Sequence, residues 1–444
     1  MRGDALESVH RRGVFMALLV VVALGLRAGV VGWLSDTVPY TDFAMYHVAG
    51  AEIARDPGFL FDAAAARRLP QIHWWPPGYP AFLGSVYALL GLNHRAAVWV
   101  QVLLGVLTCV FVYGLARRLL GERVARSAAM LVALNPTYIF LTNQLASENL
   151  YMFWLTLGLW MVGESAHRAR SVDEVDAAPS PRAAAALACG AGIVLGLGAL
   201  TRAVGLVVPA VAALWMWRGA RASHRARVAW MLAGVVLAIT PWSVRNALVV
   251  GQPAVVSFGG GLNFYFGHNE EHIGYQDVAT SPLASIRDPA ELDRTGYKLG
   301  LQFIGAHPGR DLRNAAGKLG ALYAFPDYAL HVNSGILIPD VRAHPERAAE
   351  AQARLQRQRA RDRWLHGPLT VIARVYYICL GVAAFLTVVR SRAASPGLRL
   401  AVWLVLAWTL VHVVYWAQPR FRAPVEVPLA LLAAPSLAFR SRDA

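Results

Sequence analysis

Apolar runs of about 17 to 24 residues recur along this 444-residue chain, each long enough to cross roughly 30 Å of hydrocarbon as a helix. Inside lipid, backbone N–H and C=O groups must be satisfied within their own segment, and the runs lack the two-residue alternation of a membrane barrel. Hydrophobic residues make up 56% of the chain and charged residues only 16%. The sequence therefore predicts an all-α polytopic membrane protein.

The arginines gather in short hydrophilic joints between the runs, which explains the net charge of +15 without a nucleic-acid partner. Because short basic joints face the cytoplasm, we expect both termini on that side of the cell (inner) membrane. This orientation predicts ten spans, at residues 13–34, 95–116, 124–141, 147–163, 183–200, 203–217, 228–250, 368–389, 398–416 and 423–439. The apolar piece 78–91 is short, so we place it in the interface; if it crosses, the spans number eleven.

The same orientation divides the chain into three parts. Residues 1–250 form a transmembrane catalytic core that includes a first outer loop at 35–94. Residues 251–367 form an extracytoplasmic loop region, and residues 368–444 carry the C-terminal transmembrane helices. The two long hydrophilic segments are therefore predicted to lie on the same, extracytoplasmic face.

The first outer loop begins with a carboxylate at the edge of the membrane. Asp42 and Tyr46 are four residues apart and share one face of a predicted helix. The alternative is that Asp42 only complements the helix dipole, with Thr41 as the cap. Farther along, "IHWWPPGYPAF" supplies His73 and Trp75, which either shape a pocket or anchor the loop in the interface.

Ionisable residues also lie within the runs or at their ends, where they are costly and usually face a polar cavity. They comprise an acid beside an asparagine and five arginines: Glu148 with Asn149, then Arg27, Arg202, Arg245, Arg420 and Arg422. A single arginine could instead reach the headgroups. Because the predicted orientation of the spans brings these arginines toward one membrane face, binding of a shared anion is the simplest explanation for them. A lipid-linked phosphate fits, since the guanidinium fork stays charged and binds phosphate oxygens bidentately.

Six motifs, in this order and spacing, resemble the GT-C superfamily of membrane glycosyltransferases. The chain is most similar to the bacterial relatives of protein O-mannosyltransferases and of the lipid A aminoarabinose transferase, over residues 14–434. The motifs are "TDFAMYH", "WWPPGYPAFL", "NPTYIFLTNQLASENLYMFWL", "GLGALTRAVGLVVP", "PWSVRNALVVGQPAVVSFGGGLNFYFGHN" and "QPRFRAPVEVPLALLAA".

The resemblance implies roles for particular residues. Asp42 falls on the family's proposed catalytic base, and Arg202 stands where the family places a ligand of the donor phosphate. Phe43 replaces a second acid that relatives often carry, which puts a paired-acid or metal-binding role in doubt. The aminoarabinose transferase has a Glu-Lys pair where this chain has Trp74 and Trp75, which argues against that substrate. The family also implies interfacial helices in the first outer loop.

The outer segment 251–367 adds further candidates. "SFGGGLNFYFGHNEEH" places His268 and Asn269 after three glycines, which predicts a mobile loop that approaches the substrate. The alternative is a divalent metal bound by the neighbouring histidines and acids of 268–272, although we expect no cofactor. Residues 341–366 favour helix with alternating charge, which predicts a surface helix over the membrane.

Together these features predict an inverting glycosyltransferase that moves a sugar from a polyprenyl-phosphate donor to an extracytoplasmic acceptor, which is a protein, a polysaccharide or a lipid. Asp42 would be the base, and Arg202, Arg245, Arg420, Arg422 and Arg27 would bind the donor phosphate. The pocket would comprise Tyr46, His73, Trp75, Glu148, Asn149, His268 and Asn269. One alternative is a flippase or transporter, but the chain shows no repeated halves. The other is a glycan ligase or polymerase, which would use similar chemistry from one very large late loop.

Overall fold

The structure of the chain is a computed structural model. It describes residues 2–34, 42–62, 71–171, 181–218, 222–270, 281–325, 345–391 and 395–438, and at several helix ends and over most of 345–366 it describes the backbone only. All regular secondary structure in these ranges is helical, which confirms the predicted all-α fold.

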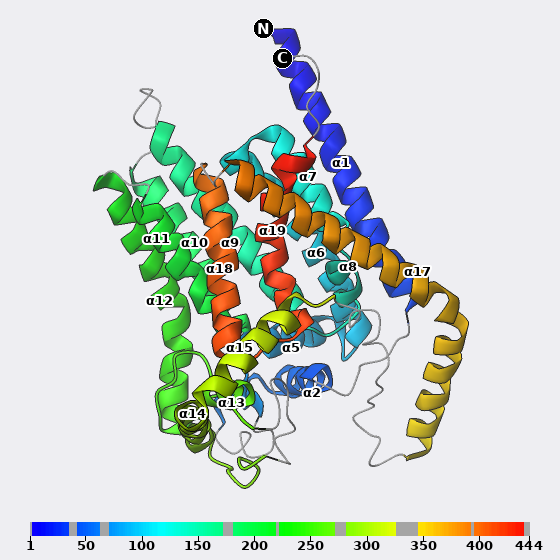
Figure 1. The fold of residues 1–444 in the computed structure, drawn as a ribbon, viewed down its shortest axis with the longest axis vertical. Coiled ribbons are helices and arrows are strands. Elements are labelled where there is room, and N and C mark those ends of the chain that lie inside the picture. Colours follow the sequence, from blue (N-terminus) through cyan, green and yellow to red (C-terminus); the bar gives the residue numbers. More distant parts are fainter. Residues whose placement is uncertain are drawn as a thin grey trace.

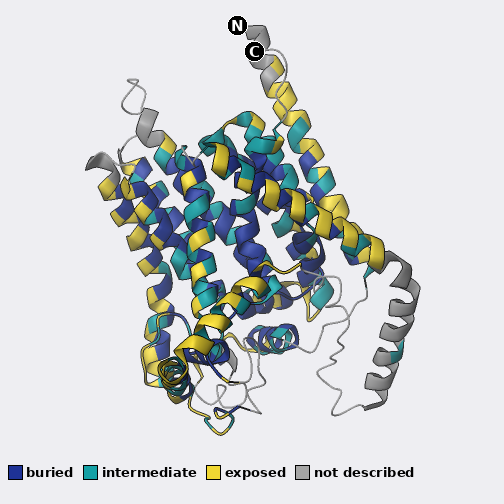
Figure 2. Cartoon of the chain, viewed as in Figure 1, coloured by how far each residue is buried: buried dark blue, intermediate teal, exposed yellow. Residues whose placement is uncertain are grey.

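Ten of the helices form an upright bundle (Figure 1). They are α1 (Arg2–Trp33), α6 (His94–Leu120), α7 (Glu122–Ala133), α9 (Ser147–Ser171), α10 (Pro181–Thr201), α11 (Val207–Arg218), α12 (Ala222–Val250), α17 (Pro345–Ser391), α18 (Pro396–Val414) and α19 (Ala423–Leu437). The interior of the bundle is buried, whereas apolar side chains on outward faces, such as those of α1, α12 and α17, are exposed (Figure 2). A bilayer would cover such a perimeter.

Six described helices are long and apolar enough to cross a membrane: α1, α6, α10, α12, α17 and α18. The other four predicted spans fall on α7 with the short α8 (Pro136–Leu141), on α9, on the turn η2 (Ala203–Leu206) with α11, and on α19. The number of ten spans therefore stays a prediction.

Two predicted elements differ in detail. The expected span 124–141 is divided between α7 and α8, because Pro136 lacks an N–H and Asn135 caps α8 by accepting a hydrogen bond from the Tyr138 N–H at 3.1 Å. Residues 345–366 of the expected surface helix 341–366 form one continuous helix, α17, with the span 368–389, and 341–344 lie outside the described residues. The side chains that would decide what most of 345–366 covers lie outside the described residues.

Glycines allow α10 and α12 to touch backbone to backbone. A Cβ at Gly192 would lie 1.8 Å from the Met231 carbonyl oxygen, and one at Gly234 would lie 2.1 Å from that of Cys189. Small residues at such crossings let membrane helices gain dispersion energy from close approach. This pair provides a rigid support for the turn after α10, which carries Arg202.

The shorter helices of both outer segments lie at one end of the bundle, opposite the end where α1 begins and α19 finishes (Figure 1). The first segment contributes α2 (Asp42–Arg55), η1 (Pro57–Phe61), α4 (Gln71–Trp74) and α5 (Gly78–Leu90), and the second contributes α13 (Gly260–Gly267), α14 (Pro289–Ala306) and α15 (Pro308–Tyr323). We call this the outer end. The predicted proximity of the two segments agrees with this arrangement.

The second segment packs onto the turn that precedes α19. Leu262, Leu292 and Leu322 of its three helices form a core with Trp416 and Phe421. Phe421 belongs to the 3₁₀ turn η5 (Pro419–Arg422). The second outer segment therefore covers the turn that carries two of the predicted site arginines.

Candidate active site

Four predicted site residues from distant parts of the chain meet at the outer end. Glu148, at the start of α9, has its Oε1 2.9 Å from Arg202 Nη1 and 3.1 Å from Arg420 Nε. Arg420 extends from η5, and its Nη2 lies 3.0 Å from Asp42 Oδ2 at the start of α2. These residues, which we call the central cluster, alternate in charge, so each ion has an opposite partner.

The two carboxylates of the central cluster differ in exposure. The Glu148 side chain is 1% exposed and the Arg420 side chain 7%, whereas the Asp42 side chain is 37% exposed. A hydroxyl arriving from outside can therefore reach Asp42 but not Glu148. Glu148 fixes the two guanidinium groups from the buried side, and Asp42 presents an accessible carboxylate on the exposed side.

Tyr46 closes one side of the central cluster. Its hydroxyl is hydrogen-bonded to Ser147, which also accepts from Arg202 Nη1 at 3.0 Å. Burial, together with the charge of Asp42, raises the pKa of Tyr46 above its ordinary value, so the phenol keeps its proton. Its ring lies 4.8 Å from that of Trp75, which places this predicted pocket residue in contact with the cluster's edge.

Aromatic rings cover the guanidinium groups. The Phe421 ring lies 5.2 Å from Arg202 and 5.5 Å from Arg420, and the Phe43 ring lies 5.2 Å from Arg420. Each contact is a cation–π interaction in a desolvated place. Phe43 thus occupies, with an aromatic face, the position where the resemblance implied a second acid.

Arg245 lies apart from the central cluster, beside His73. Its Nε donates to the Leu60 carbonyl at 2.5 Å, and its Nη1 lies 3.1 Å from His73 Nδ1. Arg245 is 2% exposed and His73 3%, yet Arg245 Nη2 and His73 Nε2 have no hydrogen-bond partner. No described carboxylate lies within 4 Å of Arg245 as an ion pair. This pair therefore offers two buried N–H groups and one uncompensated positive charge.

The first testable prediction concerns the charge of His73. Burial, reinforced by the Arg245 guanidinium, lowers the pKa of His73 to about 4, against 6.5 ordinarily. Between these values the unfolded chain binds the additional proton, so stability rises with pH in that window and falls on acidification. We expect the thermal unfolding midpoint to drop between pH 6.5 and 4.5, and to drop by a few °C less (roughly 2–4 °C per kcal/mol) in His73→Gln.

Tryptophan fluorescence of the detergent-solubilised protein would measure this midpoint. His47, whose pKa burial also lowers to about 4, remains in the variant and should preserve part of the acid sensitivity. An identical pH dependence in wild type and His73→Gln would show that His73 is not held neutral by its surroundings.

Arg27 lies on the inner side of Glu148. It is 1% exposed, donates to the carbonyls of Ala23 at 3.1 Å and Ala133 at 3.4 Å, and leaves its Nε without a partner. A cavity of about 20 Å³, lined in part by Arg27, Glu148 and Asn149, separates it from the central cluster. This volume holds about one water molecule.

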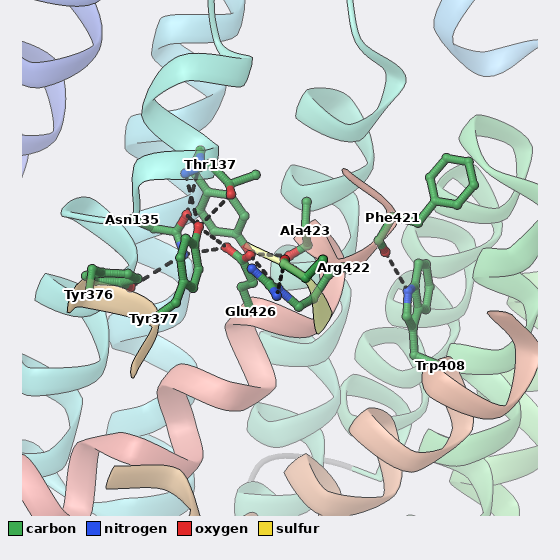
Figure 3. A network of polar contacts seen from close by, with 11 residues as sticks. Asn135, Thr137, Tyr376, Tyr377, Trp408, Phe421, Arg422, Ala423 and Glu426 are labelled. Carbon is green, nitrogen blue, oxygen red and sulfur yellow. Dashed lines mark hydrogen bonds and ion pairs between the residues drawn. The ribbon is translucent and has the colours of Figure 1, made fainter. Parts of the chain in front are cut away.

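Arg422, on the same turn as Arg420, points into a different group of polar side chains. Its Nε lies 3.2 Å from Glu426 Oε1, and its Nη1 donates to the Ala324 carbonyl at 3.0 Å. Figure 3 shows the Glu426 carboxylate between Arg422 on one side and Asn135 and Tyr377 on the other. Arg422 therefore does not join Arg420 at Asp42 and Glu148.

His268 and Asn269 directly follow α13 in the second outer segment. His268 Nδ1 is 2.6 Å from Asp311 Oδ1 and its Nε2 is 2.6 Å from the Val414 carbonyl oxygen. Asn269 donates to the carbonyls of Tyr265 and Phe266. His268 therefore joins α13 to α15 and to the end of α18, whereas these two Asn269 contacts stay within α13.

The structure describes only three of the residues, 268–270, that the alternative of a metal at 268–272 involves. In the ranges that the structure describes, no three His, Cys, Asp or Glu side chains gather as metal ligands would. Glu271 and His272 lie outside those ranges. The structure therefore leaves that alternative untested.

Sequence reasoning missed several residues that hold the site. Ser147 joins Tyr46 to Arg202, and Gln101, buried in α6, accepts from the Tyr79 hydroxyl at 2.6 Å. Lys318 of α15 is fully buried and donates to the carbonyls of Gly267 and Tyr415, and burial lowers its pKa to about 8. No sequence signal singles out Lys318, because its helix also carries Arg310, Asp311 and Arg313.

The bundle with its helical outer end has the GT-C fold, as the sequence motifs predicted. Residues 75–244 match the sequence family described as dolichyl-phosphate-mannose-protein mannosyltransferase. This matched range includes Glu148 and Arg202 and ends just before Arg245.

Solved structures show the same arrangement at low identity. The apo oligosaccharyltransferase of Archaeoglobus fulgidus is 14% identical with a TM-score of 0.51, over 96% of this chain and 50% of that chain. AglB of the same organism, in complex with an inhibitory peptide and a dolichol-phosphate, is 15% identical with a TM-score of 0.45, over 95% and 49%. ArnT from Cupriavidus metallidurans in the apo state is 15% identical with a TM-score of 0.42, over 97% and 78%.

The chain thus spans about half the length of the oligosaccharyltransferase, and the likeness concerns the fold. A comparison with curated proteins gives no match.

Proposed function

We propose that the protein is an inverting glycosyltransferase that moves a sugar from a polyprenyl-phosphate donor to a hydroxyl group of an acceptor at the outer end, on the extracytoplasmic face. The observation that carries the proposal is the pairing of a partly exposed Asp42 with Arg420, whose other partner, Glu148, also binds Arg202. The matched family supports the donor class, because its description names a lipid-linked phosphate sugar and a protein acceptor.

In the proposed reaction Asp42 accepts the proton of the acceptor hydroxyl as its oxygen attacks the anomeric carbon. The bond from that carbon to the phosphate oxygen breaks on the opposite face, so the configuration inverts and polyprenyl phosphate leaves. Arg420 keeps the Asp42 carboxylate in one orientation at 3.0 Å. Positioned general-base help of this kind contributes roughly 100- to 10,000-fold to a rate.

Charge compensation indicates which arginines have capacity for the phosphate. Arg420 has two carboxylate partners, whereas Arg202 has only the shared Glu148 and its Nε is unpartnered. Arg245 has no carboxylate partner among the described residues, and its Nη2 is unpartnered beside His73 Nε2. A buried cation without a counterion is costly, so a bound phosphate would relieve that cost. We therefore assign the phosphate contacts to Arg245, His73 and Arg202.

The leaving group gains negative charge as its bond breaks. Guanidinium groups that already surround it stabilise that charge more in the transition state than in the ground state, which accelerates the reaction. Arg420, held by the rings of Phe43 and Phe421, would contribute to this field from the Asp42 side. Residues of the two outer segments, whose helices form the rest of the outer end, would then select the acceptor.

The direct test is a lipid analysis of cells that lack the gene. We expect a polyprenyl phosphate carrying one sugar to accumulate and one envelope glycan, glycolipid or glycoprotein to lose that sugar, both measured by mass spectrometry. Complementation with the wild-type gene should reverse both changes. Unchanged lipid-linked sugars together with unchanged envelope glycans would contradict the proposed function.

A further inference from the structure

The turn η5 carries two arginines that serve different partners. Arg420 reaches Asp42 and Glu148 in the central cluster. Arg422, two residues later, pairs with Glu426 one turn into α19. The conformation of four residues, Pro419–Arg422, therefore couples the central cluster to the group around Glu426.

Glu426 is the centre of that group. Its Oε2 accepts from Asn135 Nδ2 at 2.5 Å and from the Tyr377 hydroxyl at 3.3 Å, while its Oε1 faces Arg422 Nε at 3.2 Å. Thr137 joins the Tyr377 hydroxyl at 2.5 Å (Figure 3). The carboxylate thus connects α19 with α17, with the junction before α8 and with η5.

These groups are shielded from water, so the geometry of the pair has few alternatives. The side chains of Glu426 and Arg422 are 0% and 4% exposed. A buried ion pair contributes little net stability but is costly to break, because the remaining charge is left without a partner. The Tyr377 ring also lies 4.5 Å from the Arg422 guanidinium. Arg422 is consequently held in one orientation.

Side-chain hydrogen bonds also fix the backbone at the C-terminal end of the same turn. The Trp408 indole donates to the Phe421 carbonyl at 2.9 Å, and the Tyr138 hydroxyl donates to the Ala423 carbonyl at 2.5 Å. Arg422 adds a contact with Ala324, just after α15, so the turn also touches the second outer segment. The side chains of the turn add the packing of Phe421 against the second outer segment and the pair of Arg422 with Glu426.

We propose that Glu426 is a positioning residue of the proposed transferase: by holding Arg422 it fixes η5, and so keeps Arg420 aligned with Asp42 and Glu148. This inference rests on the proposed function. It gives Arg422 a supporting part instead of a phosphate contact, and it places a determinant of Asp42 geometry on α19. Glu426 touches neither donor nor acceptor in this scheme.

A double-mutant cycle between Glu426 and Arg420 tests the inference in the purified full-length protein. Glu426→Gln should lower sugar transfer by about 10- to 100-fold in the wild-type background, since residues in one network couple strongly. In the Arg420→Gln background the same substitution should change the residual rate by less than about 3-fold, because the residue that Glu426 positions is already absent. Equal losses in both backgrounds, or no loss in wild type, would overturn the inference.

A milder variant covers the case in which Glu426→Gln does not fold. Tyr377→Phe removes only one hydroxyl from the Glu426 carboxylate and should lower transfer by about 3- to 10-fold, again only when Arg420 is present. Ser436→Ala is the matched control, because it removes a hydrogen bond to Thr387 between the same two helices, α17 and α19, away from η5. Its rate should equal that of the wild type.

The outcomes separate this inference from the proposed function. If the purified wild-type protein transfers no sugar from polyprenyl-phosphate donors, the proposed function fails, and the inference fails with it because it rests on that function. If Asp42→Asn is inactive but the effect of Glu426→Gln is independent of Arg420, the function stands and the positioning role of Glu426 is wrong.

Discussion

Asp42→Asn is expected to lower sugar transfer by at least about 100-fold while the protein still binds its lipid donor. The amide is the same size as the carboxylate and can still contact Arg420, but it cannot accept the proton of the attacking hydroxyl. Asp42 is partly exposed and is the first residue of α2, so the change should leave the fold intact. The measurement is release of polyprenyl phosphate from sugar-linked donor by purified enzyme with a membrane extract as acceptor.

Asp56→Asn provides a control of the same chemistry in the same outer segment. Asp56 caps η1 by accepting from the Gly58 N–H at 2.8 Å, and asparagine caps equally well. Asp56 has no contact with the central cluster, so the control should transfer sugar at the wild-type rate. Equal rates for Asp42→Asn and wild type would remove Asp42 from the chemistry and with it the proposed mechanism.

The fold was predictable because the bilayer imposes strong rules. Long apolar runs could only be helices, and the arrangement of arginines placed the two outer segments together. The predicted helix boundaries were less exact where a proline lies in or beside a long apolar run. Pro136 divides one predicted span, whereas α17 continues through the expected boundary before 368 despite Pro368. Proline removes a helical N–H in both cases, but tertiary contacts decide whether the helix stops.

Most residues of the candidate site could be predicted from the free-energy cost of placing a charge in an apolar run, but the pairs that they form could not. An arginine or glutamate in an apolar run is expensive, which singles out Glu148, Arg202, Arg245 and Arg420. Which cation meets which anion depends on helix positions that no local pattern encodes. Arg420 and Asp42 are 378 residues apart, and Asn135 and Glu426 are 291 apart.

Neutral supporting residues were harder still to predict. Nothing in the sequence distinguishes Ser147 and Gln101 from other polar helix residues, and only their burial and contacts in the folded chain give them a role. Phe43 shows the reverse case. The resemblance implied an acid that is absent at this position, and the fold places an aromatic ring over Arg420 there.

Arg245→Gln and Arg202→Ala should both weaken donor binding, but Arg202→Ala should lower the free energy of unfolding more. Arg245 has no carboxylate partner, so its removal leaves no buried charge unpaired and should not lower the free energy of unfolding by more than about 1 kcal/mol. It should nevertheless weaken the donor by about 10- to 100-fold, because a hydrogen bond between charged groups contributes about 1.5–3 kcal/mol.

Arg202→Ala removes one of the two cations that neutralise Glu148, which is 1% exposed. Arg420 still compensates Glu148, so the loss of stability should stay below the about 3–5 kcal/mol of a fully broken buried pair. It should still exceed that of Arg245→Gln. Donor affinity and transfer rate should fall together, since the same guanidinium faces the phosphate in the ground state and in the transition state.

Thermal unfolding with and without a polyprenyl-phosphate sugar separates these effects in one experiment. Wild type should be stabilised by the donor, and both variants much less, because a ligand stabilises the folded state according to its affinity. Without donor, Arg245→Gln should unfold near the wild-type temperature and Arg202→Ala below it. If Arg245→Gln keeps full stabilisation by the donor, the uncompensated charge of Arg245 serves another ligand, and the phosphate must lie against Arg202 and Arg420 alone.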